Sequence, residues 1–162
     1  MRFSLVDRID SLEAGQSITA IKNLSLAEEY LADHFPGFPV EPGVLMLESM
    51  VQASAWLMRF SDDFQFSTVL LKEARAVRFN SFLQPGQTLN ITSVIHRREP
   101  RSYVFKATGT VDGNSTVSAR LTLEQFNLSE REASLAGTDQ KLTKEMQELF
   151  SLLWKPETPA VG

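Results

Sequence analysis

Apolar residues change their spacing along the chain, and these changes mark the predicted elements. Residues 43–60 (GVLMLESMVQASAWLMRF) place apolar side chains on nearly every face of a helix and follow directly after Pro42. Proline suits the first position of a helix, where a backbone N–H has no partner in any case. A helix that is apolar on most faces is buried by other elements. The pattern therefore predicts a helix, buried all round, from Pro42 to about Phe60.

Four segments rich in Val, Ile, Thr and Phe follow this helix and are typical of strands. Turn signals separate them at residues 85–86 (Pro-Gly), 99–100 (Glu-Pro) and 112–114 (Asp-Gly-Asn), and the last is typical of a tight hairpin. The predicted strands cover roughly 66–80, 87–98, 101–112 and 114–126. One long buried helix with an antiparallel meander indicates an α+β fold, in which a curved sheet wraps around the helix.

The residues before the central helix predict shorter elements. Extended segments are expected at 3–8 and 16–24, around a turn at Gly15. Ser25 is a good helix cap and Glu28 follows three residues later, which is the spacing of a capping box. A short helix is therefore predicted within residues 25–33.

The C-terminal region has a different pattern from the rest of the chain. Residues 128–139 are polar, whereas residues 140–154 carry apolar side chains at helical spacing and predict an amphipathic helix. Such a helix packs on its own sheet or on a partner, and its simplest role is that of a stabilising appendage. The end, residues 156–162, is expected to be disordered. We divide the chain into a domain of residues 1–127 and a C-terminal extension of residues 128–162.

Composition and charge exclude several functional classes. The chain has 162 residues, enough for one domain with a core, and its net charge of −4 argues against nucleic-acid binding. The absence of cysteine excludes disulfides and thiol nucleophiles, and two histidines alone argue against a metal site. No apolar run is long enough to span a membrane, and Asp7 and Asp10 stand where a signal peptide would be apolar. A cytoplasmic location is therefore expected.

One carboxylate stands within the apolar central helix. Glu48 has Leu47 and Met50 among its neighbours, and burying an unpaired charge is costly. Burial is expected to raise the pKa of Glu48, which favours a protonated acid that can donate. Gln52 lies one turn later on the same face, where it can orient the carboxyl group by a hydrogen bond. The alternative is a buried glutamate paired with an arginine elsewhere in the fold.

A histidine precedes the helix in a loop with few accessible conformations. Pro36, Pro39 and Pro42 stiffen the segment after His34, so the imidazole is held at low entropic cost. The ordinary pKa of histidine suits proton transfer near neutrality. Gly43 begins the helix, where free N–H groups and the helix dipole would polarise a bound thioester carbonyl. Glycine here either allows that close approach or is simply a flexible residue beside proline.

These residues belong to one continuous motif, HFPGFPVEPGVLMLESMVQA, which begins at His34. It closely resembles the signature of the FabZ-type β-hydroxyacyl-acyl-carrier-protein dehydratases of bacterial fatty-acid synthesis. The segments LVDRI, AIKNLS and KEARAVRFNSFLQPGQTLNI also resemble their counterparts in that family. The resemblance covers roughly residues 3–125, and the extension after Leu128 lies outside it.

The resemblance implies a hot-dog fold, with an antiparallel sheet around one central helix, and dimers that often assemble as trimers of dimers. It implies active sites at the dimer interface, with His34 from one subunit and Glu48 from the other. Gly43 stands where a backbone N–H binds the thioester carbonyl, and Val40 and Gln52 complete the predicted substrate-binding residues. Glutamate rather than aspartate resembles the branch that only dehydrates, not the branch that also isomerises the new double bond.

The implied reaction converts (3R)-3-hydroxyacyl thioesters, carried on the phosphopantetheine arm of an acyl carrier protein, to trans-2-enoyl thioesters. His34 would remove the α-proton, the Gly43 N–H would stabilise the charge on the carbonyl, and Glu48 would protonate the departing hydroxyl. No metal or organic cofactor is expected.

Two further sets of residues are candidates by type. An apolar tunnel for the acyl chain would draw on Phe38, Leu45, Met50, Trp56, Phe79 and Phe82. Five arginines are either a basic patch for the acidic carrier protein or solvated strand ends. They are Arg75, Arg78, Arg97, Arg98 and Arg101.

Glu41 departs from the family, which more often has an apolar residue, commonly methionine, at this position. The departure leaves the substrate open. The alternatives are the same reaction in a specialised lipid or polyketide pathway, thioester hydrolysis on the same fold, and a non-enzymatic acyl-binding protein. The presence of both His34 and Glu48 argues against the last, since a binding protein needs neither.

Overall fold

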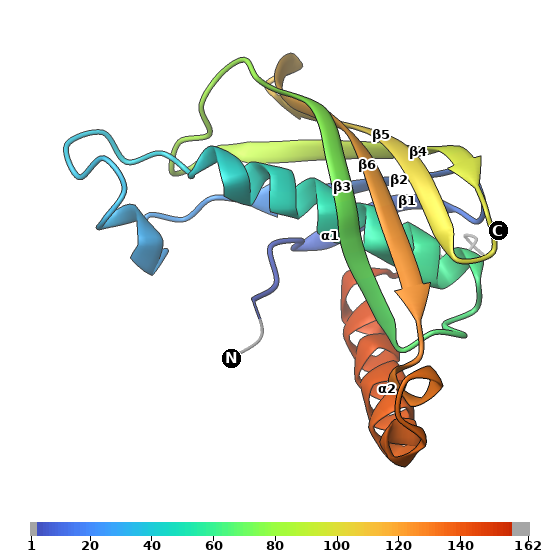
Figure 1. Cartoon of the computed structure of the whole chain (residues 1–162). Helices are drawn as coiled ribbons and strands as arrows, with labels where there is room; N and C mark the ends of the chain where they lie inside the picture. Colours follow the sequence, from blue (N-terminus) through green and yellow to red (C-terminus); the bar gives the residue numbers. More distant parts are fainter. Residues whose placement is uncertain (1–2, 157–162) are drawn as a thin grey trace, which may run out of the picture.

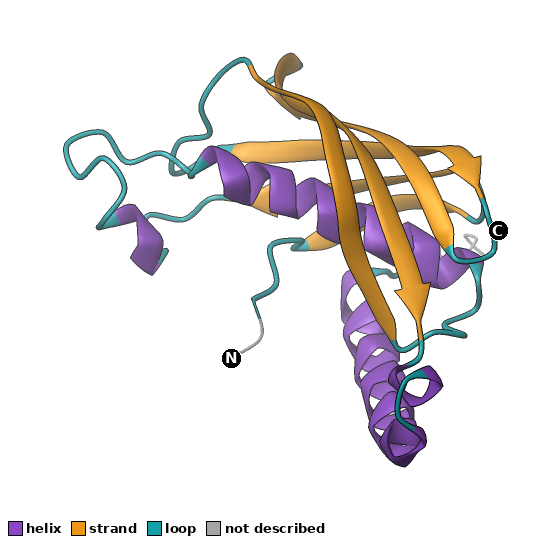
Figure 2. Cartoon of the chain, in the orientation of Figure 1, coloured by secondary structure: helices purple, strands orange, loops and turns teal. Residues whose placement is uncertain are grey.

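An antiparallel sheet curves around one long helix, α1 (Gly43–Ser61), in the computed structural model, which describes residues 3–156 (Figure 1). The strands lie in the order β1-β2-β4-β5-β6-β3, so β1 and β3 form the two edges of the sheet. The strands are β1 (Arg8–Glu13), β2 (Ser17–Asn23), β3 (Thr68–Phe79), β4 (Thr88–Arg98), β5 (Ser102–Val111) and β6 (Asn114–Phe126). The predicted α+β fold, with a sheet wrapped around a central helix, is confirmed (Figure 2).

The sheet buries one side of α1 and leaves the other side partly open. Met46, Met50 and Leu57 recur at helical spacing, belong to the core and are at most 2% exposed. On another side of the helix, Val44 is 67% exposed and Glu48 is half-buried. The prediction that the helix is buried all round is therefore wrong, because one curved sheet covers only part of the helix surface.

The four predicted strands after the helix agree with β3 to β6 to within two residues at each end. The second N-terminal segment, residues 16–24, is also confirmed as β2, and the turn before it places Gly15 at a φ of 72°. The first prediction, a strand at residues 3–8, is wrong, because β1 starts only at Arg8. Residues 3–5 instead bind the side chain of Gln52 on α1.

Two predictions at helix starts need correction. Only one turn of 3-10 helix, Glu29–Leu31, forms within residues 25–33. The predicted capping box does not form, because the carboxylate of Glu28 accepts a hydrogen bond from the Lys22 ammonium at 2.8 Å. Pro42 is the N-cap of α1 rather than its first helical residue, with a ψ of 133°.

A second helix, α2 (Ala136–Leu153), packs across the C-terminal part of α1, and Figure 2 shows it extending beyond the sheet. The predicted amphipathic helix at 140–154 is therefore confirmed, with a start four residues earlier. Phe150 is its main contact: its ring centroid lies 5.8 Å from Trp56, 5.5 Å from Phe60 and 5.3 Å from Phe64. The extension thus packs on the central helix of its own chain. The predicted disordered end lies outside the described residues, apart from Pro156.

Asp139 links the start of α2 by hydrogen bonds to the residues that come just before β3 and just after β6. Its carboxylate accepts hydrogen bonds from the Ser67 hydroxyl and from the backbone N–H groups of Leu128 and Ser129, both at 2.9 Å. Burial opposes the ionisation of Asp139, but the hydrogen bonds from Ser67 and residues 128–129 outweigh it and hold the pKa of Asp139 below its usual range. These bonds join Ser67, which precedes the predicted domain boundary after residue 127, to Asp139, which follows it. The division of the chain at residue 127 remains a prediction.

Four polar side chains, two buried and two half-buried, form hydrogen bonds at the base of the loop that leads into α1. Lys22 is 3% exposed and bonds Glu28, while the Tyr30 hydroxyl donates to Glu41 Oε1 at 3.4 Å. Glu41 is 1% exposed, and its second oxygen, Oε2, has no hydrogen-bond partner in the structure. Burial raises the pKa of Glu41 to about 7, against the opposing effects of the Lys22 charge and the Tyr30 hydrogen bond. Glu41, which differs from the residue expected from the resemblance, is therefore a buried acid.

We expect Phe150→Ala to lower the free energy of unfolding by about 3 kcal/mol, because it removes the ring that fills the space between α1 and α2. Leu152→Ala is the matched control on the same helix, since Leu152 is 72% exposed. The control should change the free energy of unfolding by less than about 0.5 kcal/mol. Urea denaturation measures both changes, and equal losses in the two variants would contradict this packing of α2.

We expect Glu41→Gln to change how stability depends on pH. The folded state raises the pKa of Glu41, so the contribution of this residue to stability is present below the ordinary glutamate pKa and is lost as the pH rises through about 7. Glutamine keeps the uncharged shape at every pH. The free energy of unfolding of the variant, relative to the wild type, should therefore rise by roughly 2 kcal/mol between about pH 5 and pH 8.

Urea denaturation at several pH values measures this difference. Glu13→Gln is the control, because Glu13 is exposed at the end of β1. A Glu41→Gln profile parallel to that of the wild type would show that the folded state does not hold Glu41 in its protonated form.

Candidate active site

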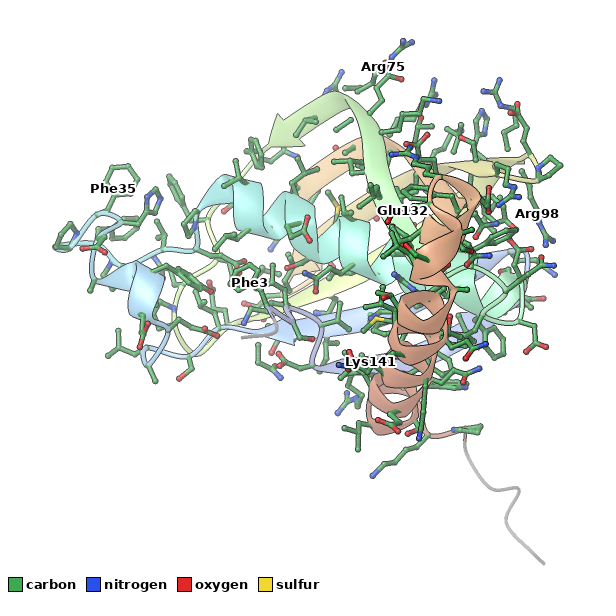
Figure 3. All side chains as sticks on the ribbon, turned by 60° about the horizontal axis from the view of Figure 1, so that its bottom comes forward. Phe3, Phe35, Arg75, Arg98, Glu132 and Lys141 are labelled. Carbon is green, nitrogen blue, oxygen red and sulfur yellow. The ribbon has the colours of Figure 1, made fainter. Side chains whose placement is uncertain are left out.

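His34 lies in the loop before α1, which stands away from the sheet (Figure 1). Its imidazole packs edge-on against the neighbouring Phe35 ring, with 4.5 Å between the ring centroids. Figure 3 shows Phe35 at the outer end of this loop. Phe35 has a φ of 50°, which is unusual for a bulky residue, and its carbonyl accepts a hydrogen bond from the Phe38 N–H at 2.7 Å. Pro36 and Gly37 thus form a tight turn that fixes the backbone beside the histidine.

The first turn of α1 has free backbone donors. Pro42 makes no side-chain cap hydrogen bond, and its carbonyl accepts the N–H of Leu45 at 2.8 Å. The N–H groups of the first helical residues have no partner inside a helix, and this end of the helix dipole is positive. A carbonyl oxygen bound at Gly43 would therefore be polarised.

Packing also favours a glycine at position 43. A Cβ atom at this position would lie 3.0 Å from the ring of Phe79 on the edge strand β3. This contact gives a third explanation for the glycine, beside carbonyl access and flexibility. The ring of Phe79 remains 50% exposed, so its other side is free to meet another molecule.

Glu48 lies in the second turn of α1 with its carboxyl group held by a hydrogen bond. Gln52 Nε2 donates to Glu48 Oε1 at 3.0 Å, which is the contact that the helical spacing predicted. Gln52 is itself fixed, because its Nε2 also donates to the Phe3 carbonyl at 3.1 Å and its Oε1 accepts the Leu5 N–H at 2.9 Å. Within residues 3–156, Glu48 forms no ion pair with an arginine. The alternative prediction, a structural pair between Glu48 and an arginine, is therefore wrong for this part of the chain.

A cavity of about 290 Å³ extends from Glu48 along α1. Glu48, Gln52, Ala55 and Arg59 line it at spacings of four, three and four residues, so they form one stripe of the helix. Strand β3 adds Val69, the N-terminal segment adds Phe3 and Ser4, and α2 adds Met146 and Leu149. His34 does not line this cavity. One chain therefore brings Glu48, Gln52 and an apolar cavity together, but not the histidine.

The remaining predicted residues are divided between cavity, core and surface. Trp56 lines the cavity, whereas Met50 is fully buried in the core. Phe38 and Phe82 are about half-exposed and pack against each other outside the cavity, with ring centroids 5.7 Å apart. Val40 is 1% exposed, so its side chain belongs to the core of the chain and does not line the cavity.

Most of the five candidate arginines are paired with acidic residues. Arg98 bonds Asp62 at 2.5 Å and Arg101 bonds Glu130 at 2.8 Å. Arg75 pairs with Glu73 at 2.8 Å and Arg97 with Glu99 at 3.3 Å. These pairs reduce the net positive charge of the predicted patch.

The strand register shows a basic row that the sequence analysis missed. Arg75 on β3 lies opposite Arg120 on β6, and Arg120 lies opposite Lys106 on β5. Like charges directly opposite each other on neighbouring strands are destabilising, and of these three residues only Arg75 pairs with an acidic side chain, Glu73, among residues 3–156. Regular pairing outward from the hairpin, in which Val111 lies opposite Asn114, would place Lys106 opposite Ala119. The irregularity between Gly109 and Thr110 shifts the register by one residue and brings Lys106 opposite Arg120.

Two further observations concern metal ions and membranes. Among residues 3–156, no three His, Asp or Glu side chains lie close enough together to hold a metal ion. In the same part of the chain, neither helix is both long and apolar enough to cross a membrane.

Solved structures with low sequence identity share the fold. One is a chain of the dehydratase heterocomplex ApeI:P from Xenorhabdus doucetiae, with a TM-score of 0.66, 20% identity, and coverage of 82% of this chain and 89% of that chain. Another is a thioesterase from Pseudomonas aeruginosa, with a TM-score of 0.59, 15% identity, and coverage of 75% and 81%. These likenesses confirm the hot-dog fold and, at such identities, show nothing beyond it.

Sequence relatives are more informative. A family model described as a FabA-like domain matches residues 1–120. The 3-hydroxyacyl-[acyl-carrier-protein] dehydratase FabZ of Levilactobacillus brevis is 37% identical over 117 residues, which are 72% of this chain and 79% of the relative. The FabZ dehydratase of a Janthinobacterium species is 40% identical over 122 residues, 72% of this chain and 77% of the relative. With the loop histidine and the helix glutamate already in place on a hot-dog fold, these matches show that the chain belongs to the FabZ-type family of 3-hydroxyacyl-acyl-carrier-protein dehydratases.

Proposed function

We propose that this protein dehydrates (3R)-3-hydroxyacyl thioesters on acyl carrier protein to trans-2-enoyl thioesters, in fatty-acid biosynthesis. The observation that carries the proposal is Glu48, whose carboxyl group is oriented by Gln52 and lines a mainly apolar cavity without forming an ion pair with an arginine of residues 3–156. The curated relatives are named for this reaction, which supports the same assignment. A cytoplasmic location and the primary pathway are part of the proposal.

Three groups of the protein carry out the chemical steps of the proposed reaction. His34 takes the α-proton, and the electrons of that C–H bond move towards the thioester carbonyl. The free N–H of Gly43, at the positive end of α1, stabilises the developing negative charge on the carbonyl oxygen. The electrons then form the C2–C3 double bond as the C3–O bond breaks, and Glu48 protonates the departing hydroxyl, which leaves as water.

The hydrogen bonds of Glu48 indicate which oxygen carries this proton. Gln52 donates to Oε1, so that oxygen must be an acceptor. Oε2 is then the oxygen that is free to hold a proton and to donate it. Gln52 acts as a positioning residue, because it fixes the carboxyl group and is itself fixed by the backbone of residues 3–5.

We further propose that two chains complete the site. His34 and Glu48 of one chain share no cavity, which leaves each of them without its catalytic partner. Strand β3 is an open edge of the sheet within residues 3–156, and Leu70, Leu71 and Phe79 on it are 40–50% exposed. An open edge with exposed apolar side chains is suited to pairing with a second copy. A trimer of such dimers is a further expectation from the family.

The proposed carrier partner is supported by charge. Acyl carrier proteins are acidic, and the row formed by Arg75, Arg120 and Lys106 presents three cations on neighbouring strands. Arg78 lies on the same strand as Arg75 and lines the same surface depression. A carrier protein docked there would offset the repulsion between these cations.

We expect His34→Ala and Glu48→Gln each to reduce turnover of 3-hydroxyacyl-carrier-protein substrates by at least ~100-fold, because each removes one proton-transfer group. The assay uses substrates of several chain lengths and identifies the products by mass. Circular dichroism confirms that both variants are folded. Unchanged turnover in either variant would refute its catalytic role, and free carrier thiol without enoyl product would indicate hydrolysis instead.

Mixing these two variants tests the shared site. In a heterodimer, one site combines the intact His34 of one chain with the intact Glu48 of the other, while the second site lacks both. After co-refolding at equal amounts, random pairing should restore about one quarter of the wild-type activity per chain. Each variant refolded alone is the control. A mixture as inactive as its components would show that each chain holds a complete site.

A further inference from the structure

The cavity that begins at Glu48 contains a cation that dehydration does not use. Arg59 lies eleven residues after Glu48 on the same stripe of α1 and lines the same cavity. Eleven residues correspond to roughly 16 Å along a helix, at about 1.5 Å per residue. Glu48 and Arg59 therefore lie towards opposite ends of this stripe.

Among residues 3–156, no carboxylate pairs with the guanidinium of Arg59. Its Nε is buried without a hydrogen-bond partner, and Arg59 forms no ion pair with the described part of the chain. The guanidinium lies over the Trp56 ring, whose centroid is 5.5 Å from Cζ. Burial lowers the pKa of Arg59 to about 10, so the group remains charged at neutral pH. Other arginines of this protein, such as Arg98 and Arg101, bond an acidic side chain.

Arg59 is half-buried and only its Nε is fully buried, so the charge is partly shielded from water and is open to pairing with a ligand in the cavity. Arginine is well suited to bind a carboxylate, because its planar N–H groups match the two carboxylate oxygens. The cavity wall between Glu48 and Arg59 is mainly apolar: Val51 and Ala55 come from α1, Val69 from β3, and Met146 and Leu149 from α2. This arrangement fits a ligand with an acyl chain in the middle and an anionic group at its far end.

We propose that Arg59 binds the distal end of the acyl chain and that the preferred substrates are acyl thioesters whose distal end carries a carboxylate. The inference rests on the proposed function, because it places the thioester end of the chain near Glu48. Arg59 is then a specificity-determining residue, and α2 contributes Met146 and Leu149 to the cavity.

Binding of non-reactive ligands tests this inference separately from catalysis. The probes are acyl-pantetheine amides in pairs of equal carbon number, one ending in a carboxylate and the other in a methyl group. Calorimetry on the full-length protein should show that the carboxylate-ended member of at least one pair binds about tenfold more tightly, which is the effect of one charge-assisted pair. Equal binding, or tighter binding of the methyl-ended member, at every length would overturn the proposal.

Three variants locate the effect. Arg59→Gln should abolish the preference for the carboxylate, and Arg59→Lys should keep part of it. Arg131→Gln is the matched control, because Arg131 also lies over an aromatic ring, 4.7 Å from the centroid of Phe126, but is exposed and outside the cavity. It should keep the full preference. If Arg59→Gln does not fold, Arg59→Lys and the wild-type comparison still decide the outcome.

Turnover of the matching 3-hydroxyacyl thioesters separates the two proposals. Enoyl product from both members of a pair, with the methyl-ended member preferred, would support the dehydratase function and overturn the role of Arg59. No enoyl product from either member would refute the proposed function, while the calorimetric preference would still decide what Arg59 binds.

Discussion

The packing of α1 against a single sheet is the constraint on which the rest of the structure depends. The sheet takes the side of the helix that carries Met46, Met50 and Leu57 into the core. Apart from its edge strand β3, the sheet does not reach the other side of the helix, which is left for other segments to cover. The N-terminal residues, β3 and α2 do so only in part, and the space they leave is the cavity beside Glu48. Core and candidate site are thus two faces of one helix.

Local pattern was sufficient to predict much of this arrangement. The four strands after the helix follow from turn residues and β-branched side chains, which act over a few positions. The Gln52–Glu48 bond follows from the four-residue repeat of a helix, which needs no tertiary information. Where a contact is set by helical spacing, the sequence was a reliable guide.

Contacts between distant parts of the chain could not be predicted in the same way. The backbone of Phe3 binds a side chain forty-nine residues away, and no periodicity encodes such a partner. The short helix at 25–33 was overestimated because Glu28 pairs with Lys22 on β2 instead of capping. The cavity beside Arg59 could not be predicted, because no sequence pattern indicates where α2 packs. As a second charged residue within the apolar helix, on the stripe of Glu48, Arg59 itself could have been noticed.

The contact between Gly43 and Phe79 links the helix start to the outer edge of the sheet. One side of the Phe79 ring lies against Gly43, while half of the ring is exposed on β3. Any chain that pairs with β3 would therefore contact the ring that packs on Gly43, the residue proposed to bind the carbonyl. Under the proposed dimer, the Phe79 ring would therefore couple assembly to the carbonyl-binding position at Gly43. A monomer formed by dilution would then differ at this position as well as lacking the partner's catalytic residue.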